Sequence, residues 1–310
     1  MHRLLALLAA LLLAACTGHA SKDATVVIAP GSSLRAAANA LEKEGAIGSA
    51  SAFLRNAKIF GGSAAIKPGE YEIKAGMGDS EILTLLQSGK TKQRFVIIPE
   101  GMPSVMVHDR LMAAPFLTGE AAVPPEGSIL PDAYAYTRGE PRAAVVKRME
   151  AAMTKTLAKA WPERKPSTVA KSPEEAIILA SIVEKETAKA SERRLVAGVY
   201  SNRVRMGMKL QADPTIIYPV TRGRPLGRRI LKSEVEAIND YNTYTKSGLP
   251  IGPVANPGKA SIEAVLDPAP THALFFVADG TGGHVFAETG AEHSANVNKW
   301  FALRRQKGEM

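Results

Sequence analysis

Apolar residues recur along this chain at spacings that predict short strands alternating with amphipathic helices. The leucines and alanines of LRAAANALEKEG repeat at helical spacing after Ser32 or Ser33, either of which can cap the helix, and Gly45 is expected to end it. The elements expected in this first part are strand 25–29, a helix through Glu44, helix 49–60, strand 69–74, helix 80–86 and strand 94–98. Residues 25–98 are therefore expected to form a small α+β module.

A second region is expected to begin after Pro99-Glu100-Gly101, which combines turn-forming residues. Helices are expected at 104–112 and 141–160, the latter basic and amphipathic, with a loop at 114–128 between them. The stretch 126–134 mixes turn formers with apolar and aromatic residues, so we expect it to pack against the fold. The pattern as a whole predicts a mixed α+β chain.

The most informative helix is expected to start at Ser172, a good N-cap, with Pro173 in the first helical position and Glu175 completing a capping box. Its apolar stripe is predicted to consist of Ile178, Leu179, Ile182 and Val183. Glu186 follows Val183 and Ile182 by three and four residues, so its carboxyl group is expected on the same face. Glu184 and Lys185 are expected to point toward solvent or a boundary.

A carboxyl group at the edge of an apolar face is costly to ionise, so burial would raise the pKa of Glu186 and let it act as a general acid. Two plainer interpretations stay open at this point. The side chain could be solvated, as most helical glutamates are, or could form a salt bridge with Lys209 or Arg203.

A further helix is predicted from Ser191, as N-cap, through about Met206, with Gly207 as its stop. The polar loop that follows contains Asp213-Pro214, a turn initiator. Such a loop could line a cleft.

Four blocks resemble the signature of the endolytic murein transglycosylase family, the YceG-like proteins. They are EGSILPDAYAY (126–136), ASIVEKETAKASERRLVAGVYSNRVRMGMKLQADPTIIYP (180–219), YNTYTKSGLPIGPVANPG (241–258) and LFFVADGTGGHVFAETGAEHSANV (274–297). KPGEYEIKAGM (67–77) and IPEGM (98–102) match more loosely. The resemblance covers most of residues 25–302.

The resemblance implies a small LysM-like α/β module at 25–98 and a mixed α+β catalytic domain at 99–303. It implies an enzyme that cuts the β-1,4 bond between N-acetylmuramic acid and N-acetylglucosamine within peptidoglycan glycan strands, leaving 1,6-anhydro ends. The family's catalytic glutamate is the second of the E-K-E-T motif, which falls on Glu186. The family's role is to end or trim new strands beside the cell-wall synthases.

One glutamate is enough for this reaction, because the 6-hydroxyl of the sugar replaces water as the nucleophile, whereas a hydrolase usually needs two carboxylates. No cofactor and no metal are expected. The candidates for binding sugar hydroxyls and acetamido groups are Gln211, Asp213, Tyr241, Asn242, Thr243 and Tyr244. For each of them, a structural role in holding loops is an equal alternative.

The N-terminus predicts export. Residues 1–16 have a basic start, an apolar run and then Cys16, the single cysteine, in a context that resembles a bacterial lipobox. Acylation of Cys16 would anchor the chain to a membrane, facing the periplasm, where the family favours the inner membrane. A plain signal peptide or a short signal anchor is the alternative. Residues 17–24 are expected to form a tether and 304–310 a basic tail.

The formal net charge is +9 and the pI about 9.6, which favours polyanionic partners. A protein outside the bacterial cytoplasm rarely meets nucleic acid, so no nucleic-acid partner is expected, and anionic lipid and peptidoglycan are expected instead. The basic stretch 222–232 could contact either of these or the anionic peptide stems, although a solvated loop is the commoner explanation.

The sequence also allows two other interpretations. His284, Glu288, Glu292 and His293 suggest a metal site, but the sequence around His284 predicts a β-hairpin with a GTGG turn, which fixes no third ligand. A non-catalytic peptidoglycan-binding scaffold of the synthesis machinery is the competing class of function.

Overall fold

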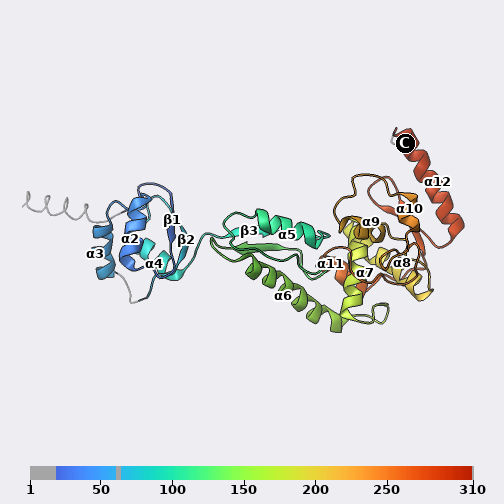
Figure 1. Cartoon of the computed structure of the whole chain (residues 1–310), viewed down its shortest axis with the longest axis horizontal. Coiled ribbons are helices and arrows are strands. Elements are labelled where there is room, and N and C mark those ends of the chain that lie inside the picture. The colour runs from blue at the N-terminus through green and yellow to red at the C-terminus, as the bar shows by residue number, and fades with distance from the viewer. Residues whose placement is uncertain (1–18, 61–63, 309–310) are drawn as a thin grey trace, which may run out of the picture. The chain divides into compact units, whose positions relative to one another are not determined.

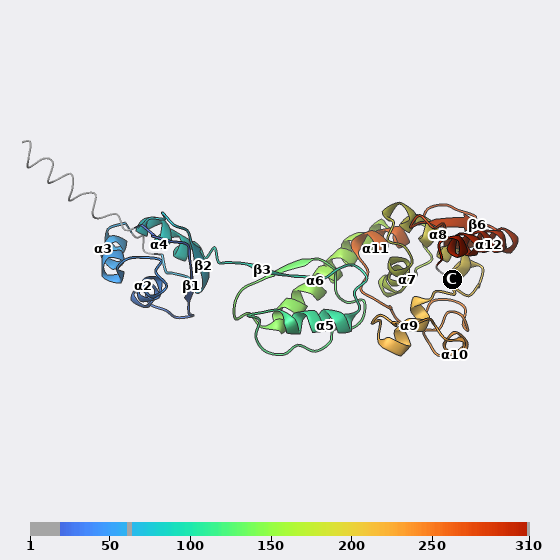
Figure 2. The same cartoon turned by 90° about the horizontal axis from the view of Figure 1, so that it is seen from above.

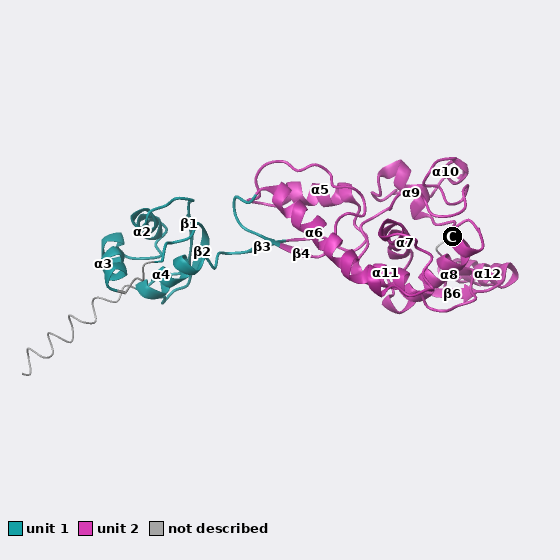
Figure 3. Ribbon diagram, turned by 90° about the horizontal axis from the view of Figure 1, so that it is seen from below, with its two compact units in different colours: residues 1–95, 135–140 teal, residues 96–134, 141–310 magenta. Residues whose placement is uncertain are grey.

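The structure is a computed structural model that describes residues 19–60 and 64–308. The chain divides into two compact units, each considered by itself (Figure 3). Unit 1 comprises the chain up to residue 95 together with 135–140, and unit 2 comprises 96–134 and 141–310. Both units combine helices with small antiparallel sheets, so the predicted mixed α+β class is confirmed.

Unit 1 is built on two antiparallel strands, β1 (Ala24–Ile28) and β2 (Gly69–Ile73), which pair from Ala24↔Ile73 to Ile28↔Gly69. The helices α2 (Leu34–Lys43) and α3 (Ala50–Phe60) connect these strands, and α4 (Asp79–Ser88) follows them. Ser33 caps α2 by accepting a hydrogen bond from the Ala36 amide at 3.2 Å. The apolar faces meet in one core, whose largest buried members are Leu41, Phe53, Tyr71, Ile73, Ile82 and Leu86.

The predicted tether at 17–24 differs from the structure over its described part. Ala20 is buried, and its backbone exchanges hydrogen bonds with Met77 and Gly76 at 2.9 and 2.8 Å. Residues from His19 onward therefore pack on unit 1, because an apolar side chain and unpaired backbone groups lie next to a turn that can satisfy them. Cys16 and the predicted export signal lie outside the described residues.

Within the described part of the chain, none of the helices has both the length and the apolar character needed to cross a bilayer. The strands β3 (Arg94–Ile97) and β4 (Ala133–Tyr136) form a second two-stranded sheet, and the division between the units runs through both strands.

Unit 2 is mainly helical, with α7 at its centre and α8 and α11 beside it (Figures 1 and 2). Its helices are α5 (Ser104–Ala113), α6 (Arg142–Ala160), α7 (Pro173–Glu186), α8 (Arg193–Arg205), α9 (Pro214–Thr221), α10 (Lys232–Glu236), α11 (Lys259–Leu266) and α12 (Gly290–Gln306), and two 3₁₀ turns cover Trp161–Glu163 and Ala190–Glu192. The strands β5 (Phe275–Ala278) and β6 (His284–Ala287) pair antiparallel, which confirms the predicted hairpin.

The start of α7 follows the sequence prediction closely. Ser172 accepts a hydrogen bond from the Glu175 amide at 3.2 Å, and Pro173 occupies the first turn. The Glu175 carboxylate, however, accepts from the Lys171 amide at 2.7 Å, one residue earlier than a capping box requires. The buried face of α7 is also broader than predicted. It includes Ile177 and Ala180, whereas Ile178 is only half-buried, because α8, α9 and α11 all pack on this helix.

The predicted N-cap of the next helix, Ser191, is wrong. A 3₁₀ turn covers Ala190–Glu192, and α8 begins at Arg193. The reason is a contact from the hairpin: the carboxylate of Glu192 lies 2.7 Å from His284 Nδ1 and accepts from the His284 amide at 3.1 Å. The predicted basic tail is also displaced, since its first residues, 304–306, belong to α12.

Replacement of Leu179 by Ala is expected to lower the free energy of unfolding of unit 2 by about 2–5 kcal/mol, because Leu179 is fully buried in the α7 core and leaves a cavity. Ile178→Ala, its half-buried neighbour, is the matched control and is expected to cost roughly 1 kcal/mol. Urea denaturation followed by tryptophan fluorescence measures both, since Trp161 and Trp300 both lie in unit 2. Equal losses would mean that the stripe predicted from sequence describes the core better than the structure does.

Candidate active site

The carboxyl group of Glu186 lies where α7 ends. Glu186 is the last helical residue, and the backbone turns to an extended conformation at Thr187, which is itself buried. Glu186 is half-buried as a residue, but its Oε1 is buried without any hydrogen-bond partner in the protein. An unpaired buried carboxyl oxygen is costly, so it marks a position where a ligand can supply the missing partner.

Two cavities meet at Glu186 and Asp213, since both residues line both of them. The smaller one, the polar cavity, has a volume of about 290 Å³, and its other lining residues are Tyr200, Arg203, Leu210, Gln211, Tyr244, Phe276 and His293. The larger one, the apolar cavity, has a volume of about 600 Å³, and the rest of its lining is 99–103, 223–226, Met106, Lys185, Pro214, Ile217 and Val254. An extended ligand could therefore pass Glu186 with binding space on either side.

The pKa of Glu186 is raised from its usual value to about 7. Burial is the main cause, because it disfavours the charged form, and the negative charge of Asp213 acts in the same direction. A hydrogen bond from the Tyr200 hydroxyl and the positive charge of Arg203 partly oppose the rise. Glu186 can thus hold a proton near neutral pH and still release it.

The hydroxyl of Tyr200 forms a hydrogen bond with the carboxyl group of Glu186. Tyr200 comes from α8, is almost completely buried, and sets its ring edge-on to Phe276 of β5, with 5.8 Å between the ring centroids. Burial raises the pKa of its phenol well above the ordinary value, so the hydroxyl stays protonated and can donate to the Glu186 carboxyl group. With one carboxyl oxygen engaged in this way, the unpaired Oε1 is the oxygen left to carry the acidic proton.

Arg203, which lines the polar cavity, connects several of the surrounding backbone segments by hydrogen bonds. Its guanidinium is buried and donates to the carbonyl oxygens of Leu274 at 2.6 Å, Leu210 at 2.7 Å and Lys209 at 3.3 Å. These bonds tie α8 to the loop after it and to the residue just before β5. Among the described residues, neither Arg203 nor Lys209 forms an ion pair with Glu186, which excludes the salt-bridge interpretation.

Three of the six predicted sugar-binding residues, Gln211, Asp213 and Tyr244, line the polar cavity with Glu186. Gln211 has a left-handed backbone with φ of 53°, a conformation that favours glycine and costs a residue with a side chain about 1 kcal/mol or more. The Tyr244 hydroxyl donates to Asp213 Oδ1 at 2.6 Å. Burial and this hydrogen bond raise the pKa of the Tyr244 phenol above its ordinary range.

The side chains of Asn242 and Thr243 are buried and lie outside the lining of both cavities, which fits the alternative of a structural role in holding loops. The Asn242 amide donates to the carbonyls of Val235 at 3.0 Å and Ala237 at 2.6 Å. The Thr243 hydroxyl accepts from the Ala212 amide at 3.1 Å. Both residues therefore hold the loops that present Gln211, Asp213 and Tyr244.

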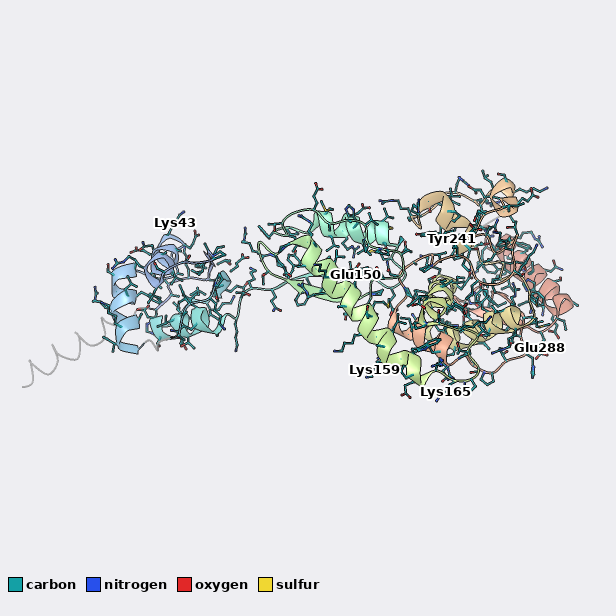
Figure 4. All side chains as sticks on the ribbon, turned by 60° about the horizontal axis from the view of Figure 1, so that its bottom comes forward. Lys43, Glu150, Lys159, Lys165, Tyr241 and Glu288 are labelled. Atoms are coloured by element: carbon teal, nitrogen blue, oxygen red, sulfur yellow. The ribbon has the colours of Figure 1, made fainter. Side chains whose placement is uncertain are left out.

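Tyr241, whose side chain is labelled in Figure 4, is not among the residues that line the two cavities. Its ring packs against that of Tyr218 on α9, with 4.9 Å between the centroids, and it closely approaches Gly252. A Cβ at position 252 would lie 3.0 Å from the Tyr241 hydroxyl oxygen, so this contact is available because residue 252 is glycine. Tyr241 thus fastens its segment to α9.

Glu184 was predicted to point toward solvent or a boundary, and the structure excludes the solvent-exposed position. Its side chain is 6% exposed and accepts from the Gly258 amide at 2.9 Å, with Arg193 Nη2 at 3.8 Å. Arg193 also reaches Glu100 at 3.3 Å. A buried carboxylate needs such partners. The partners come from loops around residues 100 and 258, which the sequence of α7 alone could not predict.

His293 and Phe276 are site residues that sequence reasoning missed. His293 comes from α12, stacks on Phe275 with 5.1 Å between the rings, and its Nδ1 is buried without a partner. Burial lowers the pKa of His293, so it is neutral at ordinary pH. Its sequence signal was a histidine among acidic residues, which suggested metal binding. Across the described residues, no cluster of three or more His, Cys, Asp or Glu side chains is arranged to hold a metal ion.

Comparisons with known proteins point in one direction. The YceG-like family model matches residues 26–299. The chain is 28% identical to a Bacillus subtilis protein named endolytic murein transglycosylase, over 90% of this chain and 85% of that protein. It is 29% identical to a Streptococcus pneumoniae protein of the same name, over 90% of this chain but only 58% of that longer protein. A crystal structure of a yceG-like protein from Listeria monocytogenes matches 89% of this chain and 99% of that chain, with 27% identity and a TM-score of 0.55.

The raised pKa of Glu186 should be visible in stability. Folding favours the protonated form, so this contribution is complete below about pH 4.5 and is lost as pH rises through about 7. Glu186→Gln removes the ionisable group. Its stability relative to wild type is expected to increase by about 3 kcal/mol between pH 4.5 and pH 8.

Urea denaturation at the two pH values tests this expectation. Glu184→Gln, which weakens a carboxylate with partners, is the control and should lower stability at both pH values. A Glu186→Gln variant with the same pH dependence as wild type would show that Glu186 titrates normally.

Proposed function

Because the chain belongs to the YceG-like family, we propose that it is an endolytic peptidoglycan lytic transglycosylase. In this proposal it cleaves the β-1,4 bond between N-acetylmuramic acid and N-acetylglucosamine within a glycan strand and leaves a 1,6-anhydro end. The observation that carries the proposal is the buried, unpaired Oε1 of Glu186, on a carboxyl group with a pKa of about 7, at the meeting point of two cavities. The names of the relatives in Bacillus and Streptococcus support it.

In the first step, Glu186 Oε1 donates its proton to the glycosidic oxygen as the bond to the anomeric carbon breaks. The 6-hydroxyl of the same muramic residue then attacks that carbon, and the ionised Glu186 takes the hydroxyl proton. The new ring bond replaces the glycosidic bond, the leaving sugar keeps the first proton, and Glu186 ends protonated as it began. No water is consumed and a single carboxyl group serves as acid and then as base.

The neighbours of Glu186 have defined parts in this proposal. Tyr200 fixes which carboxyl oxygen carries the proton, and Arg203 positions the Lys209–Gln211 segment without pairing with the acid. Asp213 keeps Glu186 protonated through its negative charge, and that charge also favours the positive charge that develops on the sugar. Gln211 and Tyr244 supply polar groups for hydroxyl and acetamido groups of the strand.

We also propose the cellular setting that the N-terminus predicts. The chain would be exported and anchored through an acylated Cys16, facing the periplasm, where it trims nascent strands beside the synthases. The small βααβ unit that precedes the catalytic unit would act as a LysM-like wall-contacting module. Mass spectrometry of the mature N-terminus tests the anchor, since a lipidated cysteine gives a mass that neither a plain cleaved signal nor an intact signal anchor can give.

Digestion of purified glycan strands tests the activity. Wild type is expected to release 1,6-anhydro products, and Glu186→Gln is expected to lower their rate by at least about 10²-fold, because the proton donor is lost. Glu174→Gln is the matched control, an exposed glutamate at the other end of α7. Ordinary reducing ends would instead indicate a hydrolase, with Asp213 as the second carboxylate. Binding of strands without any cleavage by wild type would support the scaffold alternative.

The pH profile tests the protonation state. A general acid must be protonated before the reaction, so kcat/KM is expected to fall above about pH 7. Tyr200→Phe removes a hydrogen bond that favours the ionised carboxylate, so the falling limb should move to higher pH while the anhydro product is unchanged. A limb that stays in place, or moves lower, would show that Tyr200 does not act on Glu186.

A further inference from the structure

The apolar cavity differs in kind from the polar cavity on the other side of Glu186. Its volume is about twice as large, and apolar residues and glycines outnumber the charged residues in its walls, which are Glu100, Lys185, Glu186, Asp213 and Arg224. The apolar side chains are mainly Pro103, Met106, Pro214, Ile217, Pro225 and Leu226. A saccharide alone would leave much of this surface without a matching partner, since bound polar groups need hydrogen bonds and apolar walls favour alkyl groups.

The residues that form the wall of the apolar cavity pack closely against one another. Gly223 has φ of 81°, and a Cβ there would lie 2.7 Å from Cβ of Pro103, so residues 223–226 approach the Pro103 turn as only glycine allows. On the other side, Gly101 has φ of 71°, and its added Cβ would meet the Lys185 side chain at 3.4 Å. The alkyl part of Lys185 therefore lies along the Gly101 backbone at the edge of the cavity.

Lys185 brings an ammonium group to this apolar surface without a carboxylate to balance it. Its ammonium group donates a long hydrogen bond to the Gly101 carbonyl at 3.4 Å, and among the described residues it forms no ion pair. The other charged residues that line the cavity have partners or roles already described. Arg224 pairs with Asp109 at 2.6 Å and Glu100 with Arg193 at 3.3 Å. Asp213 accepts a hydrogen bond from Tyr244 at 2.6 Å, and burial favours the protonated form of Glu186. The ammonium group of Lys185 is therefore available to form an ion pair with an anionic group of a ligand.

Peptidoglycan offers one component with both properties. The sugars of the strand carry no charge, whereas the peptide stem on each muramic residue combines alanine methyl groups with free carboxylates. Resting on the proposed function, we propose that the apolar cavity binds the peptide stem of a muramic residue beside the scissile bond, and that Lys185 pairs with a stem carboxylate. The enzyme is then specific for strands that keep their stems.

Three substrates test this specificity: strands with intact stems, the same strands with stem carboxylates converted to amides, and strands from which an amidase has removed the stems. Wild type is expected to show a KM about tenfold lower for intact stems than for either altered substrate, as one charge-assisted hydrogen bond allows. The amidase-treated strands keep a lactyl carboxylate on the sugar, so they separate that source of charge from the peptide.

Lys185→Gln is expected to lose this preference by raising KM for intact stems alone, with kcat, the pH profile and cleavage of amidase-treated strands unchanged. Lys185→Arg should restore most of the preference. Lys171→Gln, an exposed lysine just before the other end of α7, is the matched control and should behave as wild type.

Equal efficiency of wild type on all three substrates would overturn the inference, as would a Lys185→Gln variant that is impaired equally on all of them. If amidase-treated strands are cut as well as intact ones, the lactyl carboxylate is the partner and the stem is not. Failure of wild type to cleave any of the strands would instead remove the proposed function, so the two failures are distinguishable.

Discussion

The chemistry of this protein depends on one carboxyl group being kept partly out of water at the end of a buried helix. Apolar packing around α7 holds Glu186 in place, and the helix stops at that residue, so one oxygen faces the two cavities without a protein partner. Burial then keeps the group protonated near neutral pH. If α7 extended by another turn, or if a cation paired with the carboxylate, the same glutamate would be an ordinary ionised side chain.

The site also shows where stability is given up for function. Glu186 Oε1 and His293 Nδ1 are buried without partners, and Gln211 adopts a left-handed backbone without being glycine. Each feature is unfavourable by about 1–3 kcal/mol on general grounds, and all three line one cavity. The buried guanidinium of Arg203 and the amide of Asn242 offset part of this cost, since their multiple hydrogen bonds hold the surrounding loops in one arrangement.

The two cavities differ in the ligand groups that they suit. A polar cavity lined by tyrosine, glutamine and aspartate suits a hydroxyl-rich sugar, whereas the larger apolar cavity with Lys185 suits a ligand with alkyl groups and negative charge. If Lys185 pairs with a stem carboxylate as proposed, strands are selected by their peptides as well as by their sugars.

The sequence by itself determined the features that depend on residues close together in the chain. The cap at Ser172, the buried positions Leu179, Ile182 and Val183 of α7, and the β5–β6 hairpin all follow from local hydrogen bonds and periodicity. Tertiary structure decided which polar residues face the site. The side chains of Asn242 and Thr243 form hydrogen bonds that hold loops. Glu184 contacts Gly258 and Arg193. His293, on α12, lines the polar cavity. Such outcomes depend on partners that come from distant segments, because a buried polar group goes wherever the fold supplies its hydrogen bonds, and no local pattern records that position.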